Sequence, residues 1–248
     1  MAEQSSVIPV LIASHKRAGT ITTHKKVANS IICIPASQYS EYRERCPDTE
    51  IVCHPDSVIG LSWKRQWMFD HFGDAFHLDD DLMFAKRIYT ESGEKDKLTP
   101  TEIYDTIQTT ARAAKQAGVY LFGYNTSGKP FTYSSLAPIQ VSGYVNTCAF
   151  GLFKGSKLFF RPEQRYQEDY WISGLNAYYN RKIWRDNRFY FHFGETWVGA
   201  GGLAEFRNLE TLEATLNELQ GFFGKEVIAV RKTGTKNHPY QMNFKVPF

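Results

Sequence analysis

The sequence has few cysteines, no long apolar run and no internal repeat, and these absences exclude several classes of protein. The four cysteines are Cys33, Cys46, Cys53 and Cys148, and none forms a C-x-x-C pair. This spacing argues against a zinc knuckle and a redox dithiol. No stretch approaches the roughly twenty apolar residues of a membrane span. The N-terminus also lacks the basic start and apolar core of a signal peptide. We therefore expect a soluble, intracellular protein without a membrane partner.

The composition that is present is globular, with a mild positive charge. The 248 residues are 42% hydrophobic and 22% charged, which argues against long disordered stretches. This length suits one large α/β domain or two small ones. The formal net charge of +3 permits a nucleic-acid partner without requiring one. The aromatic share of 15% is high, and filling of the core is the simplest use for it.

The first half alternates short apolar strands with helices. The expected strands cover residues 7–13, 30–35, 49–54 and 74–78. The expected helices cover residues 37–46 and 60–72. This order indicates an α/β fold with a mostly parallel sheet flanked by helices. Ligands of such sheets bind outside the carboxyl ends of the strands. The segments that should meet on this rim are residues 14–17, 35–37, 54–56 and 79–81.

The second half is less regular. Thr99, Pro100 and Glu102 form a helix start with a capping box, and this helix should end near Gly118. Two or three strands or a long loop are expected between residues 119 and 154. Further helices are expected at residues 168–179 and 208–220. We expect one domain over residues 1–224 and a basic C-terminal extension over 225–248.

The motif FHLDDDLMF places three carboxylates, Asp79, Asp80 and Asp81, at the end of a strand. Adjacent carboxylates between apolar flanks repel one another and are costly to desolvate. A divalent cation removes this cost, and hard oxygen ligands suit Mg²⁺ or Mn²⁺. Such a metal can clamp two phosphates and neutralise a leaving diphosphate. The alternative is a solvated acidic turn, but the position after a fourth strand favours a metal site.

Basic and polar residues near this rim are candidates for binding a nucleotide. The loop ASHKRAGT contains Ser14, His15 and Arg17, and its single glycine fits neither a P-loop nor a dinucleotide fingerprint. Lys64 and Arg65 precede the acidic strand and could pair with a diphosphate or with the aspartates. The alternatives are an ordinary loop and a solvated helix face.

Two downstream motifs are candidates for the chemistry of transfer. Glu168 and Asp169 begin a predicted helix, where carboxylates gain from the helix dipole. Besides capping the helix, a carboxylate there could deprotonate an acceptor hydroxyl or stabilise an oxocarbenium-like centre. His192 lies in the aromatic run FYFHF. A histidine in such a run is most often structural, and His192 is a candidate third metal ligand.

With FHLDDDLMF, the strands before it and EDYW after it, the sequence resembles the GT-A class of nucleotide-sugar glycosyltransferases over roughly residues 7–195. The LDDDL form and the helix GLSWKRQWMFDHF are similar to the TET-associated glycosyltransferases of tailed phages, relatives of the base J glucosyltransferase. The resemblance implies a Rossmann-like nucleotide-sugar half over about 1–90 and an acceptor half over about 91–224. It also implies a DNA acceptor with hydroxymethylated pyrimidines.

The resemblance further implies a role for each candidate residue. Asp79 and Asp81 would form the D-x-D pair, with Asp81 on the metal and Asp79 toward the ribose, although Asp80 leaves the register open by one. The remaining roles are Ser14, His15 and Arg17 beside uracil and ribose, Lys64 and Arg65 near the nucleotide, Glu168 and Asp169 facing the acceptor, and His192 on the metal.

The expected enzyme uses a UDP-sugar and Mn²⁺ or Mg²⁺ in the cytoplasm of an infected bacterial host. It would move glucose or a pentose such as arabinose to 5-hydroxymethylcytosine in phage DNA, with the base extruded from the stack. The residues expected to contact DNA are Arg231, Lys232, Lys236 and Tyr240. Its rivals are a transferase acting on a glycan, lipid or protein, a non-catalytic DNA-binding module, and a nucleotidyltransferase. Oligomeric state and anomeric outcome stay open.

Overall fold

The computed structural model describes residues 7–90, 96–164, 166–194, 209–233 and 240–245. In the first half, the elements are β1 (Val10–Ala13), α1 (Thr23–Lys26), β2 (Ser30–Pro35), α2 (Tyr39–Arg45), β3 (Glu50–His54), α3 (Leu61–Phe72), β4 (Ala75–Asp79) and β5 (Leu82–Arg87). In the second half, they are α4 (Pro100–Gln116), β6 (Leu121–Asn125), β7 (Ile139–Gln140), β8 (Ala149–Leu152), α5 (Glu168–Tyr179), β9 (Trp184–Phe193), α6 (Leu209–Phe223), β10 (Ile228–Lys232) and β11 (Tyr240–Phe244).

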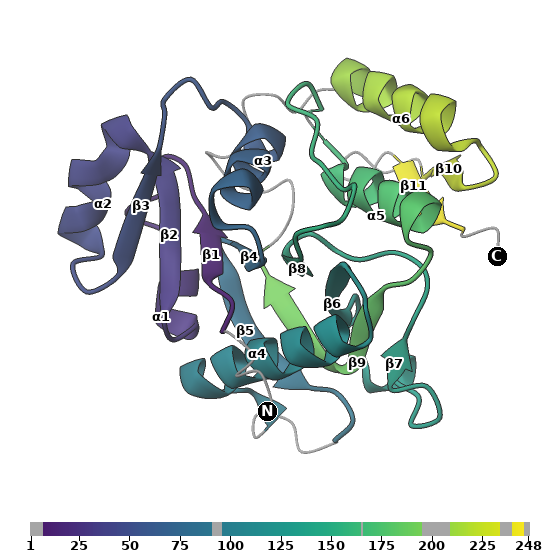
Figure 1. The fold of residues 1–248 in the computed structure, drawn as a ribbon, viewed down its shortest axis with the longest axis horizontal. Coiled ribbons are helices and arrows are strands. Elements are labelled where there is room, and N and C mark those ends of the chain that lie inside the picture. The colour runs from purple at the N-terminus through teal and green to yellow at the C-terminus, as the bar shows by residue number, and fades with distance from the viewer. Residues whose placement is uncertain (1–6, 91–95, 165, 195–208, 234–239, 246–248) are drawn as a thin grey trace.

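One large sheet runs through both halves of the chain in the order β3-β2-β1-β4-β8-β6-β9-β5, with β7 paired to β9 (Figure 1). Strands β3, β2, β1 and β4 are mutually parallel. Strand β8 is antiparallel to both of its neighbours, whereas β6 and β9 are parallel to each other. The expected fold class is therefore confirmed: the sheet is mostly parallel and helices flank it.

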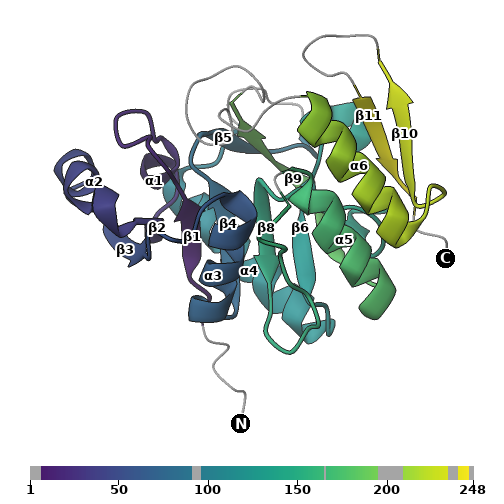
Figure 2. The same ribbon diagram turned by 90° about the horizontal axis from the view of Figure 1, so that it is seen from above.

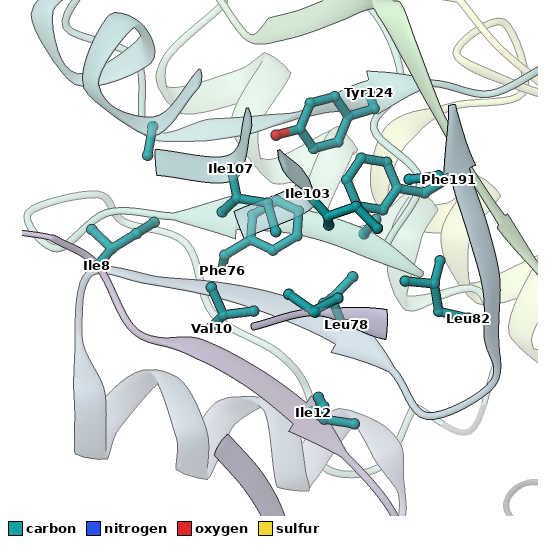
Figure 3. Close-up of a cluster of buried hydrophobic side chains, with 14 of the residues drawn as sticks. Ile8, Val10, Ile12, Phe76, Leu78, Leu82, Ile103, Ile107, Tyr124 and Phe191 are labelled. Carbon is teal, nitrogen blue, oxygen red and sulfur yellow. The ribbon is translucent and has the colours of Figure 1, made fainter. Parts of the chain in front are cut away.

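The sheet lies between two layers of helices because its strands are apolar on both faces. Val10 and Ile12 of β1 share a core with Ile103 and Ile107 of α4, which Figure 3 shows in close-up. The alternate side chains of β1 pack with Met68 of α3 on the other face. Helix α4 begins with the expected capping box, in which Thr99 accepts from the backbone of Glu102.

Strands β5 and β9 and the hairpin of β10 and β11 were not expected from the sequence. The hairpin lies beside α6 at the opposite end of the molecule from α2 and β3 (Figures 1 and 2). Ile228 of β10 is fully buried in a core shared with α5 and α6, and Met242 and Phe244 of β11 pack against that core. The described strands of the predicted C-terminal extension thus pack onto the second half. Within the described residues, no helix combines the length and apolar character that a membrane crossing requires.

Candidate active site

The carboxyl ends of the four parallel strands meet at one rim, as the strand order predicted. In the strand register, Ala13 at the end of β1 pairs with Asp79 at the end of β4. Pro35 at the end of β2 likewise pairs with His54 at the end of β3. The Ser14 backbone N–H donates to Cys33 O at 3.1 Å, which carries this alignment into the first loop. The loop after β1 therefore lies beside the acidic run.

Asp80, the middle carboxylate, is held by the loop after β1. Ser14 Oγ donates to Asp80 Oδ2 at 2.5 Å, and Arg17 Nη1 donates to Asp80 Oδ1 at 2.7 Å. Tyr42 of α2 joins this group, because its hydroxyl oxygen lies 2.7 Å from Ser14 Oγ and accepts from the Arg17 N–H at 3.0 Å. Ser14 and Arg17, two of the predicted nucleotide-binding residues, thus contact Asp80. In the D-x-D register that the sequence left open, Asp80 is therefore the carboxylate bound by the first loop. His15 bonds through Nδ1 to the side chain of Gln38 at 3.0 Å.

Asp81 is the most exposed of the three carboxylates. Its side chain is 38% exposed, against 27% for Asp79 and 7% for Asp80. Arg17 Nη1 lies 3.6 Å from Asp81 Oδ2, which is a longer approach than its contact with Asp80. Burial and the neighbouring charge of Asp80 raise the pKa of Asp81. A carboxylate that is costly to ionise and open to solvent is well suited to receive a cation.

Lys64 and Arg65 are buried in the interior instead of lying on a solvated face of α3. The Lys64 ammonium donates to the backbone oxygen of Ser14, and burial lowers the pKa of Lys64 to about 8. Arg65 is 1% exposed. Of the two pairings considered from the sequence, the structure shows pairing of Arg65 with the acidic run. Direct binding of a nucleotide by either residue stays a prediction.

Arg65 connects the acidic run to the second carboxylate site. Its Nη2 donates to Asp79 Oδ1 at 2.7 Å, and its Nη1 donates to Glu168 Oε1 at 2.7 Å. A further bond from Nη2 reaches Thr147 O at 2.8 Å, and Thr147 Oγ1 donates to the same Glu168 oxygen at 3.2 Å. The planar guanidinium suits two carboxylates at a fixed separation. Two segments far apart in the sequence therefore meet at this one side chain.

Asp169 lies beside this bridge at the start of α5. The Tyr144 hydroxyl donates to Asp169 Oδ2, and the Tyr170 N–H donates to Asp169 Oδ1 at 2.9 Å. Burial and the charge of Glu168 raise the pKa of Asp169 to about 7, and the bond from Tyr144 acts in the opposite direction. A carboxylate with a pKa near neutrality is suited to take up a proton and release it again.

His192 lies on β9, close to the acidic loop but outside any cluster of ligands. Its Nδ1 is 3.1 Å from the Tyr190 hydroxyl, and its ring centroid is 4.7 Å from that of Phe84. Among the described residues, no three His, Cys, Asp or Glu side chains gather as a metal site. A cation held by one or two carboxylates and by substrate phosphates needs no such cluster. The exposed oxygens of Asp81 fit a hard cation of this kind, and a metal-binding role for His192 stays a prediction.

Three of the four residues expected to contact DNA lie on the hairpin of β10 and β11. Arg231 and Lys232 are exposed at the end of β10. The Tyr240 hydroxyl donates to Glu213 of α6, and Lys232 Nζ lies 5.9 Å from the centre of the Tyr240 ring. Lys236 lies outside the described residues.

Three residues of this site were not identified from the sequence. Tyr42, Tyr144 and Thr147 each contact a candidate residue, and each contact joins segments more than twenty residues apart. Pairings at this separation leave no local periodicity in the sequence. The one usable signal is the placement of Tyr42 on a helix that follows a rim strand, because such a helix begins near the rim.

A parallel half ending in an acidic loop, joined through one sheet to a half that carries a second carboxylate pair, is the arrangement of a GT-A-like fold. The family model for "TET-Associated Glycosyltransferase" matches residues 8–202, which is more than half of the chain. The chain belongs to this family.

Two further comparisons were made. The fold is similar to the crystal structure of S. aureus TarS 1-349, with 8% sequence identity and a TM-score of 0.48. The similarity covers 87% of this chain and 65% of that chain, so this chain spans less than two thirds of the solved one. No curated protein matches the sequence.

Proposed function

We propose that this glycosyltransferase moves a sugar from a UDP-sugar to the hydroxymethyl group of a modified pyrimidine, 5-hydroxymethylcytosine, in DNA. The observation that carries the proposal is the pairing of two sites on one rim. Asp81 stands open at the first, and Asp169 lies at the second. Arg65 connects them through Asp79 and Glu168. The family description, which associates these enzymes with TET proteins, supports a modified base as the acceptor.

The donor side is built from the loop after β1 and the acidic run. Asp80 holds Arg17 and the buried Ser14 in place, which fixes the loop that would lie beside the uracil and ribose. Asp81 would hold Mn²⁺ or Mg²⁺, and a bound cation of this kind supplies positive charge beside the diphosphate. Arg17, 3.6 Å from Asp81, adds a second positive charge where the leaving UDP develops negative charge.

The acceptor side is built around Asp169. In the proposed step, an Asp169 oxygen takes the proton of the hydroxyl on the hydroxymethyl group while the oxygen of that hydroxyl bonds to the anomeric carbon. The bond from this carbon to the diphosphate oxygen breaks, and UDP leaves with the electron pair. Tyr144 and the Tyr170 N–H bind both carboxylate oxygens, so they fix the direction in which Asp169 points.

Replacing Tyr144 by phenylalanine tests the role of Asp169. The loss of a hydrogen bond to a charged group, roughly 1.5–3 kcal/mol, should lower kcat by about tenfold or more and leave the KM for UDP-sugar near its original value. Activity requires the ionised carboxylate, so it should fall as the pH drops through about 7. Since Tyr144 lowers the pKa of Asp169, this limb of the pH–rate profile should move to higher pH in Y144F. An unmoved limb would argue against Asp169 as the base.

A DNA acceptor also predicts a strong dependence on salt. Each neutralised phosphate releases counterions, so KM for duplex DNA should rise steeply between roughly 50 and 200 mM salt. The KM for UDP-sugar, measured in the same series, is the reference and should change far less. A flat KM for DNA would point to a glycan, lipid or protein acceptor.

The direct experiment measures UDP release with Mn²⁺ from a panel of UDP-sugars, with and without DNA that contains 5-hydroxymethylcytosine. Release that requires the modified DNA is the expected result, and the panel would separate glucose from arabinose. UDP release that is unaffected by the DNA would support a glycosyltransferase and contradict the DNA acceptor. A binding module would release nothing, and a nucleotidyltransferase would release pyrophosphate.

A further inference from the structure

Strands β5 and β9 present two faces of different character. Phe191 of β9 is buried in the core beneath α4. Side chains alternate along a strand, so the neighbouring pairs Phe84–His192 and Lys86–Tyr190 lie on the opposite face. All four of these side chains are partly exposed. This outer face of the β5–β9 pair therefore carries three rings and one positive charge close together.

A second basic residue, Lys97, lies at the edge of this face. Lys97 Nζ lies 4.9 Å from the centre of the Phe84 ring, and the Lys97 backbone bridges to Lys86. The only acid within β5 and β9 is Asp186, which is 1% exposed and paired with Arg188. The positive charge on the face is therefore not offset by an exposed acid from either strand.

The loop after β6 continues the face away from the site. A Cβ atom at Gly128 would lie 2.6 Å from the Tyr190 ring and 3.4 Å from Lys86 Cε, so this loop rests directly on that pair. Lys129 follows, with Nζ 5.7 Å from the centre of the Phe131 ring. Phe131 is 82% exposed. Lys129 and the largely exposed ring of Phe131 thus lie side by side on this loop.

At its other end, the face reaches the candidate active site. The Gly194 N–H donates to Asp81 O at 3.2 Å, and a Cβ at Gly194 would lie 3.4 Å from Asp81 Oδ2. Gly194 follows His192 by two residues and shares its side of the strand. Between Gly194 and Tyr190 the chain rises about 13 Å. This length matches roughly four nucleotides of a stacked strand.

No helix of the described chain covers this face as α5 and α6 cover the central strands. Among the described residues, the core beneath α5 and α6 takes no side chain from β5 or β9. The hairpin, by contrast, stands beside an acidic helix. Helix α6 carries Glu210, Glu213 and Glu218 without a Lys or Arg, and Glu213 accepts from Tyr240. The outer face of the β5–β9 pair therefore carries its basic side chains on an edge of the sheet that no described helix covers and that leads to the candidate active site.

We propose that the outer face of the β5–β9 pair, continued by Lys129 and Phe131, is the track along which the DNA strand carrying the acceptor base lies. Lysines of the track contact phosphates, and the exposed Phe131 ring stacks with a base, which is the pattern of single-strand recognition. This inference rests on the proposed DNA acceptor. It transfers the main DNA contact from the hairpin to the edge of the large sheet.

The test measures binding of a fluorescent single-stranded oligonucleotide with one 5-hydroxymethylcytosine over a series of salt concentrations. The double variant Lys86→Gln with Lys129→Gln should weaken binding by about tenfold at low salt and reduce the log–log salt slope by about 1.4, or 0.7 per phosphate contact. The matched control is Lys154→Gln with Lys157→Gln, two exposed lysines between β8 and α5, and it should change neither quantity. Binding of a duplex that carries the same base is measured over the same salt series as the second arm of the experiment.

The aromatic part of the track is tested with Phe131→Ala, since the exposure of this ring spares the fold. We expect binding to weaken by about tenfold with the salt slope unchanged. Tyr178→Ala on α5, where the ring is 73% exposed, is the matched control.

The hairpin variant Arg231→Gln with Lys232→Gln identifies the competing surface. If this variant shows the reduced salt slope and the track variants bind normally, the result contradicts the track but not the DNA acceptor. If the unaltered protein binds no modified DNA at low salt, the proposed acceptor itself fails and the track fails with it.

Discussion

Replacing Arg65 by methionine should lower the free energy of unfolding by about 3–5 kcal/mol. The side chain is buried, and Asp79 and Glu168 both depend on it as a partner. Methionine has a similar length but no charge, so both carboxylates would be left uncompensated in a poorly solvated place. For a chain of this size, the melting temperature should fall by roughly 6–20 °C.

Two further variants define the cause of that effect. Arg65→Lys keeps the charge but loses the fork that bonds both carboxylates, so it should melt between the wild type and R65M. Arg45→Met, on an exposed position of α2, should leave the melting temperature within about 1–2 °C. If R65M melts with the wild type, Arg65 does not hold the two sites together.

Replacing Asp81 by asparagine should lower kcat by roughly 10²–10³-fold without an effect on the fold. Asparagine has the same shape but no negative charge to hold a cation. Because Asp81 is the most exposed carboxylate of the run, its loss disturbs no buried ion pair. Steady-state kinetics over a range of Mn²⁺ concentrations, together with thermal unfolding, would measure both parts.

Asp105→Asn, an exposed change of the same chemistry on α4, is the matched control and should retain full activity. Activity near the wild-type level in D81N, at every Mn²⁺ concentration, would contradict a metal role for Asp81. In that case Asp79 or Asp80 would have to hold the cation, which requires breaking an ion pair to Arg65 or Arg17.

The nucleotide half of the fold could be predicted because its signals are local. Each buried strand is a short apolar run, and each ends at a polar loop. Strand β2 has the bounds expected from the sequence, and β1, β3 and β4 differ from expectation by at most three residues. Parallel order then determines which loops share a rim, so the approach of the first loop to the acidic run followed from topology alone.

The acceptor half was harder to predict because its strands lack a single clear period. Strand β9 reads WRDNRFYFHF, in which aromatic side chains occupy both faces. An apolar face and a partly exposed aromatic face look alike in sequence, so the run gave no alternation. Strand β5 follows β4 after only two residues, Asp80 and Asp81. The acidic motif therefore drew the interpretation away from a second strand at this point. The hairpin was missed although Tyr240, Met242 and Phe244 of β11 alternate with polar residues, because the basic residues of this segment favoured a charged extension.

Within the site, individual residues could be predicted but not their partners. Glu168 and Asp169 were recognised from their place at a helix start. The bond from Arg65 to Glu168 spans 103 residues, and the bond from Tyr144 to Asp169 joins a loop to a helix. Only the completed sheet brings these segments together. The contacts between these residues could therefore be learned only from the structure.

The most direct test of the proposed function is the mass of the modified base itself. DNA containing 5-hydroxymethylcytosine would be incubated with the enzyme, Mn²⁺ and the UDP-sugar that gives the fastest UDP release, then digested to nucleosides and analysed by mass spectrometry. We predict that 5-hydroxymethyl-2′-deoxycytidine gains the mass of one sugar residue, that unmodified 2′-deoxycytidine gains none, and that D81N slows the gain by roughly 10²–10³-fold. Release of UDP with no change in the mass of any nucleoside would contradict the DNA acceptor.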